Sequence, residues 1–315
     1  MPHISPQSPE ERGRRIAAGH GEQGDELGTL PWWAYPLAIL KRVAVGVYSE
    51  GFIHAGNLAY LSLLTLFPFF IVAAAIAHIF GRGNDGARAV ASFLHTLPPN
   101  VADLLRTPIA DVLQARTGGL LWIGALVGLW TVGSFVETIR DILRRSYGVR
   151  TSKPFWQYRL SSAAIIIGSV ILAMLAFVVQ GALTAAEQFV YRLLPELARI
   201  GPVLGLSRLA PGAVLFGALY MLFYSLTPSK YRYGGCRKWP GALFVAVWWV
   251  GVTALLPFVL SHLGGYNLTY GGLAGVIVTL VFFWLVGFGI VIGAHLNAAL
   301  AETHEPSVKD APSEA

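Results

Sequence analysis

Charged residues are scarce in this chain. Only 13% of its 315 residues are Asp, Glu, Lys or Arg, while 55% are hydrophobic, and soluble domains carry about 25% charged residues. The mean hydropathy of +0.58 agrees with this. A single cysteine, Cys236, excludes an internal disulfide and a multi-cysteine metal site. The composition excludes a soluble core and predicts an all-α protein that crosses a membrane several times.

Catalytic and metal-binding motifs are also missing. There is no Walker A pattern, no H-E-x-x-H and no G-x-S-x-G with a plausible His/Asp set. The eight histidines never show metal-ligand spacing. We therefore expect no enzyme activity, no catalytic residue, no metal site and no cofactor. We also expect no nucleic-acid partner, because the net charge of +6 has a topological explanation, given below.

Six apolar segments are long enough to cross a bilayer, which needs roughly 20 residues. They are 56–80, 118–138, 161–186, 210–228, 239–262 and 271–300. We predict a six-helix bundle over 31–300, between disordered polar tails at 1–30 and 301–315. In 32–53 apolar side chains recur at helical spacing. This predicts an amphipathic helix in the membrane interface, or a short extension that packs against the bundle. Short outer helices are expected in 81–117 and, in smaller form, in 187–209.

The basic residues predict the orientation. Six crossings place 16 of the 23 lysines and arginines on the side of both termini. The connection 229–238 carries four of them and no acidic residue, whereas "HLGGYNLTYGG" carries no Lys, Arg, Asp or Glu. The positive-inside rule makes the basic side cytoplasmic, and its charge can attract anionic lipid heads.

Polar side chains occur within the first segment, in "GNLAYLSLLTLFPFF". Asn57, Tyr60 and Pro68 fall on one stripe of a helix. We interpret the stripe as an interhelical contact with a kink near Pro68, or as a hinge or polar lining of a substrate path. Asn57 is expected to point into the bundle and to pair with Asn297, because both lie at the cytoplasmic ends of their segments.

Two further groups lie near the cytoplasmic ends. In the stretch "ETIRDILRRSYGVR", four charged residues are spaced at i, i+3, i+4 and i+7: Glu137, Arg140, Asp141 and Arg144. This spacing predicts a ladder of ion pairs on a solvated extension of the helix. The alternative is a cytoplasmic gate or a contact with lipid head groups. In "GAHLNAAL", His295 and Asn297 are about 200° apart on a helix and face different neighbours. His295 is expected to be satisfied by water or a backbone carbonyl, with a proton-linked role as the alternative.

Several stretches resemble the YihY/virulence factor BrkB family. They are "NLAYLSLLTLFPFF", "YGVRTSKPFWQYRL", "LYMLFYSLTPSKYRYGGCRKWPGALFVAVWW", "LTYGGLAGVIVTLVFFWL" and "GAHLNAAL". The match spans about residues 35–300 in the right order. The resemblance implies a six-helix protein of the bacterial inner membrane with both ends cytoplasmic. It also implies departures, because His295 stands where the family usually has glutamate and Gly272 where it commonly has serine. The family was once labelled ribonuclease BN.

Three functions follow as hypotheses. The first is a transporter or translocator of lipid-like or anionic envelope molecules, with membrane lipids as partners. The second is a non-catalytic envelope scaffold that binds protein partners through its outer loops. The third and weakest is a membrane-bound enzyme or nuclease, for which the sequence offers no catalytic constellation. The oligomeric state does not follow from the sequence.

Overall fold

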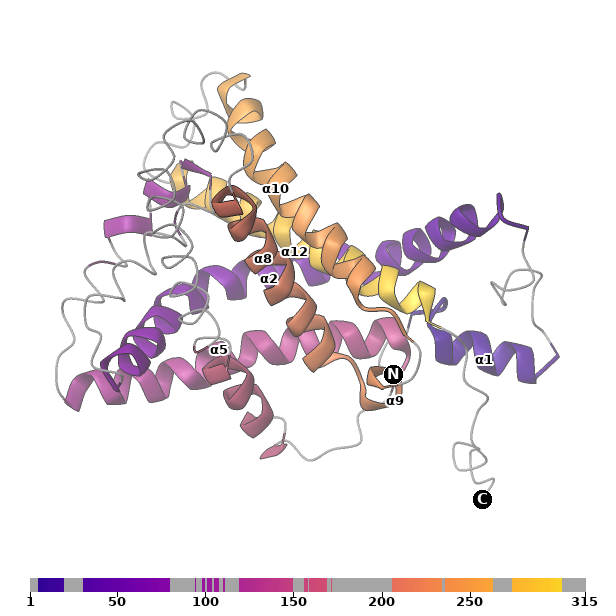
Figure 1. Ribbon diagram of the computed structural model, residues 1–315, viewed down its shortest axis with the longest axis horizontal. Coiled ribbons are helices and arrows are strands. Elements are labelled where there is room, and N and C mark those ends of the chain that lie inside the picture. The colour runs from indigo at the N-terminus through magenta and orange to yellow at the C-terminus, as the bar shows by residue number, and fades with distance from the viewer. Residues whose placement is uncertain are drawn as a thin grey trace, which may run out of the picture.

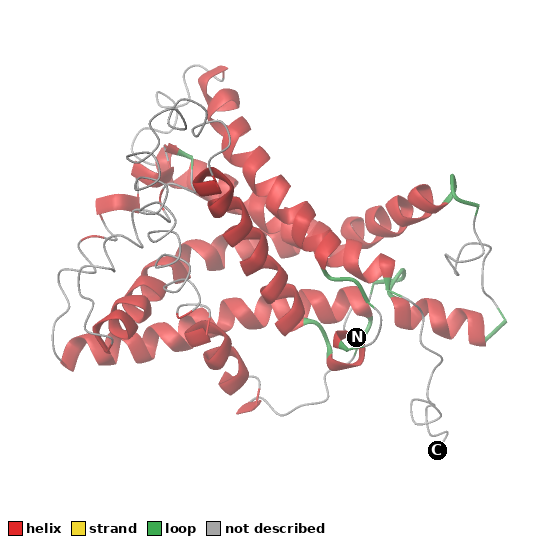
Figure 2. Ribbon diagram, viewed as in Figure 1, coloured by secondary structure: helices red, strands yellow, loops and turns green. Residues whose placement is uncertain are grey.

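The structure is a computed structural model whose described parts contain only helices, turns and loops (Figure 2). It describes residues 5–19, 31–79, 119–149, 159–168, 206–233, 236–262 and 274–301, with short pieces at 94, 98–99, 101–103, 105–107, 110, 156–157 and 171. The expected spans 118–138, 239–262 and 271–300 correspond to α5 (Gly119–Tyr147), α10 (Trp239–His262) and α12 (Ala274–Leu300). Helix α8 (Leu206–Leu226) overlaps the fourth expected span, 210–228, and begins four residues before it.

Three helices are long and apolar enough to cross a membrane within the described residues. They are Trp122–Tyr147, Trp239–His262 and Ala274–Leu300. Two shorter apolar helices cover Arg159–Gly168 and Gly212–Leu226. Most of the third expected span and the whole connection 187–205 lie outside the described residues. The chain is therefore an all-α protein with membrane-spanning helices, and six remains the predicted number of spans.

The first membrane segment is not separate from the helix before it. Helix α2 runs without interruption over Tyr35–Ile79, 45 residues that include Pro68. At 1.5 Å per residue it is about 68 Å long, more than twice the roughly 30 Å of the hydrocarbon core. The expected amphipathic segment 32–53 is thus mostly the first half of α2, and its position in the membrane interface stays a prediction.

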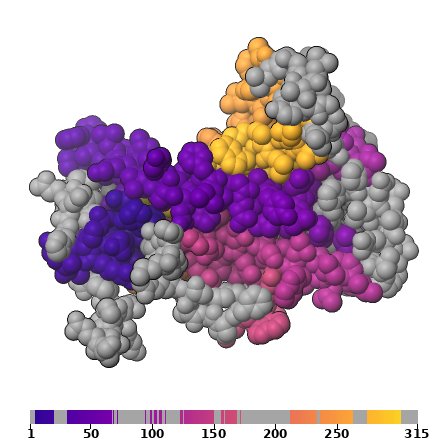
Figure 3. Space-filling model, turned by 180° about the vertical axis from the view of Figure 1, so that it is seen from behind, coloured from indigo at the N-terminus to yellow at the C-terminus, as the bar shows by residue number. Residues whose placement is uncertain are grey.

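Helices α2 and α12 pack antiparallel in a regular register. Arg42 Nη1 donates to the carbonyl of Ala299 at 3.2 Å. One turn further along α2, a Cβ on Gly46 would overlap the imidazole of His295, and further still a Cβ on Gly287 would lie 3.0 Å from Leu58 Cβ. Figure 3 shows α2 between α12 and α5, both of which it contacts.

Small residues bring α10 and α12 close together. A Cβ on Gly241 would overlap the carbonyl oxygen of Gly293, and one on Gly293 would lie 2.6 Å from Val245 Cγ2. A Cβ on Gly289 would overlap the indole of Trp248. Gly289 and Gly293, four residues apart on α12, thus permit close packing against α10. Figure 1 shows α10 crossing beside α12.

Part of the expected disordered tail at 1–30 is helical. Helix α1 covers Pro9–Ala17, and the Oγ of its N-cap Ser8 accepts a bond from Glu11 N at 3.3 Å. Arg12 is 1% exposed, and its Nη2 donates to the carbonyls of Ala298 at 3.3 Å and Ala301 at 3.0 Å. The prediction of disorder is wrong for this segment, because Arg12 satisfies carbonyls that the end of α12 leaves without helical partners.

Helix α1 also contacts the connection between α8 and α10. Glu10 Oε1 accepts a bond from the Tyr231 hydroxyl at 2.8 Å and lies 2.7 Å from Lys230 Nζ. Lys230 and Tyr231 belong to the short helix α9 (Ser229–Arg232). Ser5 N donates to the carbonyl of Arg145 near the end of α5 at 3.3 Å. The ends of α5 and α12, α9 and the N-terminal segment therefore gather at one end of the bundle, here called the basic end.

Candidate functional site

A polar groove lies between α2 and α5 towards the basic end. Its volume is about 440 Å³, and residues from successive turns of both helices line it: Ile53, His54, Asn57, Ser134, Glu137, Thr138, Asp141 and Arg145. Side chains three and four positions apart share a helix face, so α2 forms one wall of the groove and α5 forms the other. The groove combines Asn57 with Glu137 and Asp141, which the sequence suggested as two unconnected sites.

Ion pairs join the two walls of the polar groove. Glu50 Oε2 lies 3.0 Å from His54 Nε2, one turn along α2, and 3.2 Å from Arg145 Nη1 on α5. Arg145 Nε donates to Asp141 Oδ2 at 2.7 Å. Charge-assisted bonds of this kind are short and strong. Arg145 therefore links a carboxylate on its own helix to one on α2.

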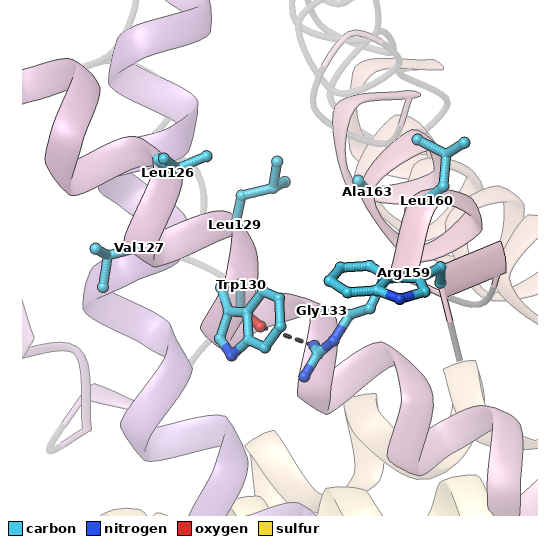
Figure 4. Close-up of a pocket in the computed structure, with 9 residues that line it drawn as sticks. Leu126, Val127, Leu129, Trp130, Gly133, Arg159, Leu160 and Ala163 are labelled. Atoms are coloured by element: carbon cyan, nitrogen blue, oxygen red, sulfur yellow. Dashed lines mark hydrogen bonds between the residues drawn. The ribbon is translucent and has the colours of Figure 1, made fainter. Parts of the chain in front are cut away.

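A second, apolar groove adjoins α5 further from the basic end (Figure 4). Its volume is about 540 Å³, and its lining is Leu126, Val127, Leu129, Trp130, Gly133, Trp156, Arg159, Leu160 and Ala163. One wall is α5 and the other is the helix Arg159–Gly168 with the preceding Trp156. Leu126 and Leu160 are 70% and 75% exposed, so both walls present hydrocarbon to their surroundings.

Arg159 lines the apolar groove and contacts two residues that line the polar groove, Ser134 and Glu137. Its Nη1 donates to the carbonyl of Trp130 at 3.0 Å and to Ser134 Oγ at 3.2 Å. Its guanidinium carbon lies 4.1 Å from the centroid of the Trp130 ring, a cation–π contact, and its Nε lies 3.5 Å from Glu137 Oε1. Figure 4 shows Arg159 reaching across to Trp130. Along α5 the lining changes from that of the apolar groove to that of the polar groove between Gly133 and Ser134.

Asn57 does not pair with Asn297. Its side chain is exposed, whereas Asn297 is 1% exposed and holds the start of α10 through Gly241 N at 2.8 Å and the carbonyl of Lys238 at 3.1 Å. The register explains the error. Ala55 faces Gly287, which is ten residues or about 15 Å along α12 from Asn297.

Tyr60 and Pro68 do not join the polar groove. Tyr60 is 60% exposed, and Pro68 lies within the continuous helix α2. Close to Pro68, the Thr65 hydroxyl donates to the carbonyl of Leu61 at 2.6 Å, as expected of threonine in an apolar helix. A bend of α2 at Pro68 stays a prediction.

The remaining candidate residues, His295, Arg140 and Arg144, do not line the polar groove. His295 is 9% exposed and packs on Gly46 of α2, so it and Asn297 face different helices, as their angular separation predicts. Arg140 is buried and its Nη2 donates to Ser161 Oγ at 3.3 Å. Arg144 is partly buried on α5. Among the described residues no three His, Cys, Asp or Glu side chains are grouped so that they could hold a metal ion.

A family model described as virulence factor BrkB matches residues 49–315. The chain belongs to this family. Among BrkB-like relatives, the ribonuclease-like protein YfkH of Bacillus subtilis is 28% identical over 260 residues, 80% of this chain and 90% of YfkH. A UPF0761 membrane protein of Pseudoalteromonas translucida is 24% identical over 275 residues, 82% of this chain and 83% of the relative. No solved structure matches the chain significantly.

The BrkB family match contains both grooves but not α1. It begins at residue 49, so Glu50, His54 and all lining residues lie inside it, while Pro9–Ala17 lies outside it. Sequence reasoning missed Glu50, His54, Arg145 and Arg159 as groove residues. The spacing of Glu50 and His54, four apart on one helix face, was the available signal for the first two.

Proposed function

We propose that this integral membrane protein binds a lipid-like envelope molecule and moves it across the bacterial inner membrane. The observation that carries the proposal is that Arg159 of the apolar groove bonds to Ser134 and pairs with Glu137, both of which line the polar groove. An amphiphile has one charged end and one hydrocarbon end. Its charged head fits the polar groove, where contacts with charged side chains replace contacts with water. Its hydrocarbon chain fits the apolar groove, whose lining is nearly all hydrocarbon.

The orientation is part of the proposal. The basic end faces the cytoplasm and both termini lie there, because lysines and arginines favour the cytoplasmic side. The head of the amphiphile then lies at the cytoplasmic leaflet, next to the charges of α5. A reporter fused after residue 233 is expected to be cytoplasmic and one after residue 100 extracytoplasmic; the reverse pair would overturn the orientation.

A liposome experiment tests the movement. Purified protein is reconstituted with phospholipid labelled on one acyl chain, and loss of label from the outer leaflet is followed by chemical quenching. We expect faster exchange between leaflets than in empty liposomes, and slower exchange with Arg159→Gln. Arg106→Gln is the matched control, because Arg106 is exposed and makes only a surface pair with Asp103 at 3.8 Å.

Two results would contradict the translocator. Exchange no faster than in empty liposomes would remove the proposed activity. A stoichiometric envelope protein crosslinked to the outer loop 81–117, and lost when that loop is replaced, would favour the scaffold hypothesis instead.

A further inference from the structure

We infer that the headgroup carries both a phosphate and a primary ammonium, so that the ligand is an aminophospholipid. The inference rests on the proposed function and narrows its substrate class. It starts from two opposite charges, the guanidinium of Arg159 in the apolar groove and the carboxylate of Glu137 in the polar groove. These come from separate helices and approach each other to 3.5 Å.

The charge balance of the polar groove argues against a purely anionic head. Among the described residues, three carboxylates line the groove or pair with its lining, on Glu50, Glu137 and Asp141, and so do two guanidinium groups, on Arg145 and Arg159. The guanidinium of Arg140, also on α5, is buried and bonds to Ser161. Arg145 is already bonded to Asp141 and paired with Glu50. A phosphate beside Arg159 therefore also lies beside the Glu137 carboxylate, which repels it unless a cation accompanies the phosphate.

Glu137 has the capacity to bind that cation. Its Oε1 is buried and accepts no hydrogen bond from the described residues. The 3.5 Å contact with Arg159 Nε is an ion pair longer than a good N–H···O bond. Buried carboxylate oxygens are ordinarily hydrogen-bonded, and a primary ammonium offers three N–H donors. A quaternary ammonium of the same charge offers none.

Several protein contacts hold Arg159 in place. Stacking on Trp130 and the bonds to the Trp130 carbonyl and Ser134 Oγ hold the guanidinium plane in one orientation. The stacked face of Trp130 is thereby occupied, so it is not open to cage a trimethylammonium group. The apolar groove beyond it takes an acyl chain. In this proposal the phosphate contacts Arg159, the ammonium contacts Glu137 and the acyl chain lies in the apolar groove.

A methylation series tests the inference. Binding to purified protein is measured for lipids with identical, tail-labelled acyl chains and headgroups of ethanolamine, N-monomethyl, N,N-dimethyl and choline type, with a phosphatidylglycerol for the anionic case. We expect affinity to fall along the series, by about tenfold or more between ethanolamine and choline, as loss of a hydrogen bond to a charged group implies. Phosphatidylglycerol should bind more weakly than the ethanolamine lipid.

Variants assign the preference to Glu137. Glu137→Gln should bind choline and ethanolamine lipids alike, while Glu137→Asp should retain part of the preference. Asp103→Asn, an exposed site on the surface pair with Arg106, should bind as the unmodified protein does. Arg159→Gln should weaken the binding of every phospholipid by a similar factor. Thermal unfolding of each variant shows whether it is folded.

The outcomes separate the two proposals. If no labelled lipid binds, the proposed function fails. If lipids bind but ethanolamine, choline and glycerol heads bind equally, or the anionic head binds best, the inference fails and the function stands. A preference for ethanolamine that survives in folded Glu137→Gln also overturns the inference.

Discussion

Asn297 of α12 fastens the first turn of α10 by accepting a hydrogen bond from the backbone N–H of Gly241 at 2.8 Å. The same amide donates to the carbonyl of Lys238 at 3.1 Å. The first N–H groups of a helix have no partner within it, and here a buried side chain of another helix supplies one. Gly241 is needed for this contact, since a Cβ there would overlap both the Gly293 carbonyl oxygen and the Asn297 amide.

The first prediction compares the two asparagines. Asn297→Leu removes two buried hydrogen bonds and should lower the free energy of unfolding by about 1–3 kcal/mol. Asn57→Leu changes an exposed side chain and should leave stability within about 0.5 kcal/mol. Thermal unfolding in detergent measures both. Equal losses would contradict the burial difference between these positions.

The second prediction concerns the contact of α2 with α12. Gly46→Ala places a methyl group against the His295 imidazole and should cost about 1–3 kcal/mol through overpacking. Gly56→Ala on the same helix meets nothing within 4 Å and should be neutral or stabilising by up to about 1 kcal/mol, because alanine favours helix. Adding His295→Ala to Gly46→Ala should recover part of the loss. A harmless Gly46→Ala would contradict the packing.

The third prediction concerns attachment of α1. Arg12→Ala should remove two bonds to the end of α12 and make residues 5–19 more sensitive to proteolysis, with a loss of about 1–3 kcal/mol. Arg14→Ala is the matched control, since Arg14 is 45% exposed in a pair with Glu11 at 3.8 Å and such pairs contribute about 0–1 kcal/mol. Limited proteolysis followed by mass spectrometry measures how fast residues 5–19 are cleaved, and so whether α1 is held against the bundle. Equal cleavage in both variants would contradict it.

The fourth prediction is a pH dependence. The pKa of Tyr231 is raised above its ordinary value, because burial disfavours the phenolate and the hydroxyl donates to Glu10. Above about pH 10 the unfolded chain loses this proton and the folded protein keeps it, so the contribution of Tyr231 to stability falls as pH rises. Tyr231→Phe should be less stable by about 1 kcal/mol at neutral pH. Its stability should fall less than that of the unmodified protein above about pH 10.

Chemical denaturation of both proteins between neutral pH and about pH 11 measures this difference. The comparison isolates Tyr231 from other groups that titrate in the same range. Parallel stability curves would show that the fold does not hold the Tyr231 proton.

Hydropathy predicted the apolar helices well where polar residues bound them. Helix α10 begins at Trp239, directly after Lys238, and ends at His262, as the expected span 239–262 does. Hydropathy could not predict the continuity of α2. It detects the change from amphipathic to apolar near residue 55, but no proline stands between Pro36 and Pro68 to interrupt the backbone.

The candidate site was predicted in parts only. Asn57 was singled out because polar groups are costly in an apolar helix. Glu137 and Asp141 were singled out because their spacing places them on one helix face. Their common groove depends on the register of α2 against α5, which neither signal contains. The pairing of Asn57 with Asn297 assumed that α2 begins near Asn57, and it begins at Tyr35. Helix α1 did have a local signal, Ser8 followed by Pro9 and Glu11, which is typical of a helix start.

The hydrogen bonds from Arg12 to the end of α12 also bear on the number of membrane spans. A bilayer cannot separate a guanidinium from a carbonyl oxygen 3.0 Å away, so residues 12 and 301 lie in one compartment. We therefore expect an even number of membrane crossings between them, and a topology map with five or seven spans would contradict this contact. Because residues 12 and 301 lie in contact, a linker that joins the chain near these positions, with a new opening in an outer connection, should give a circular permutant that inserts and folds.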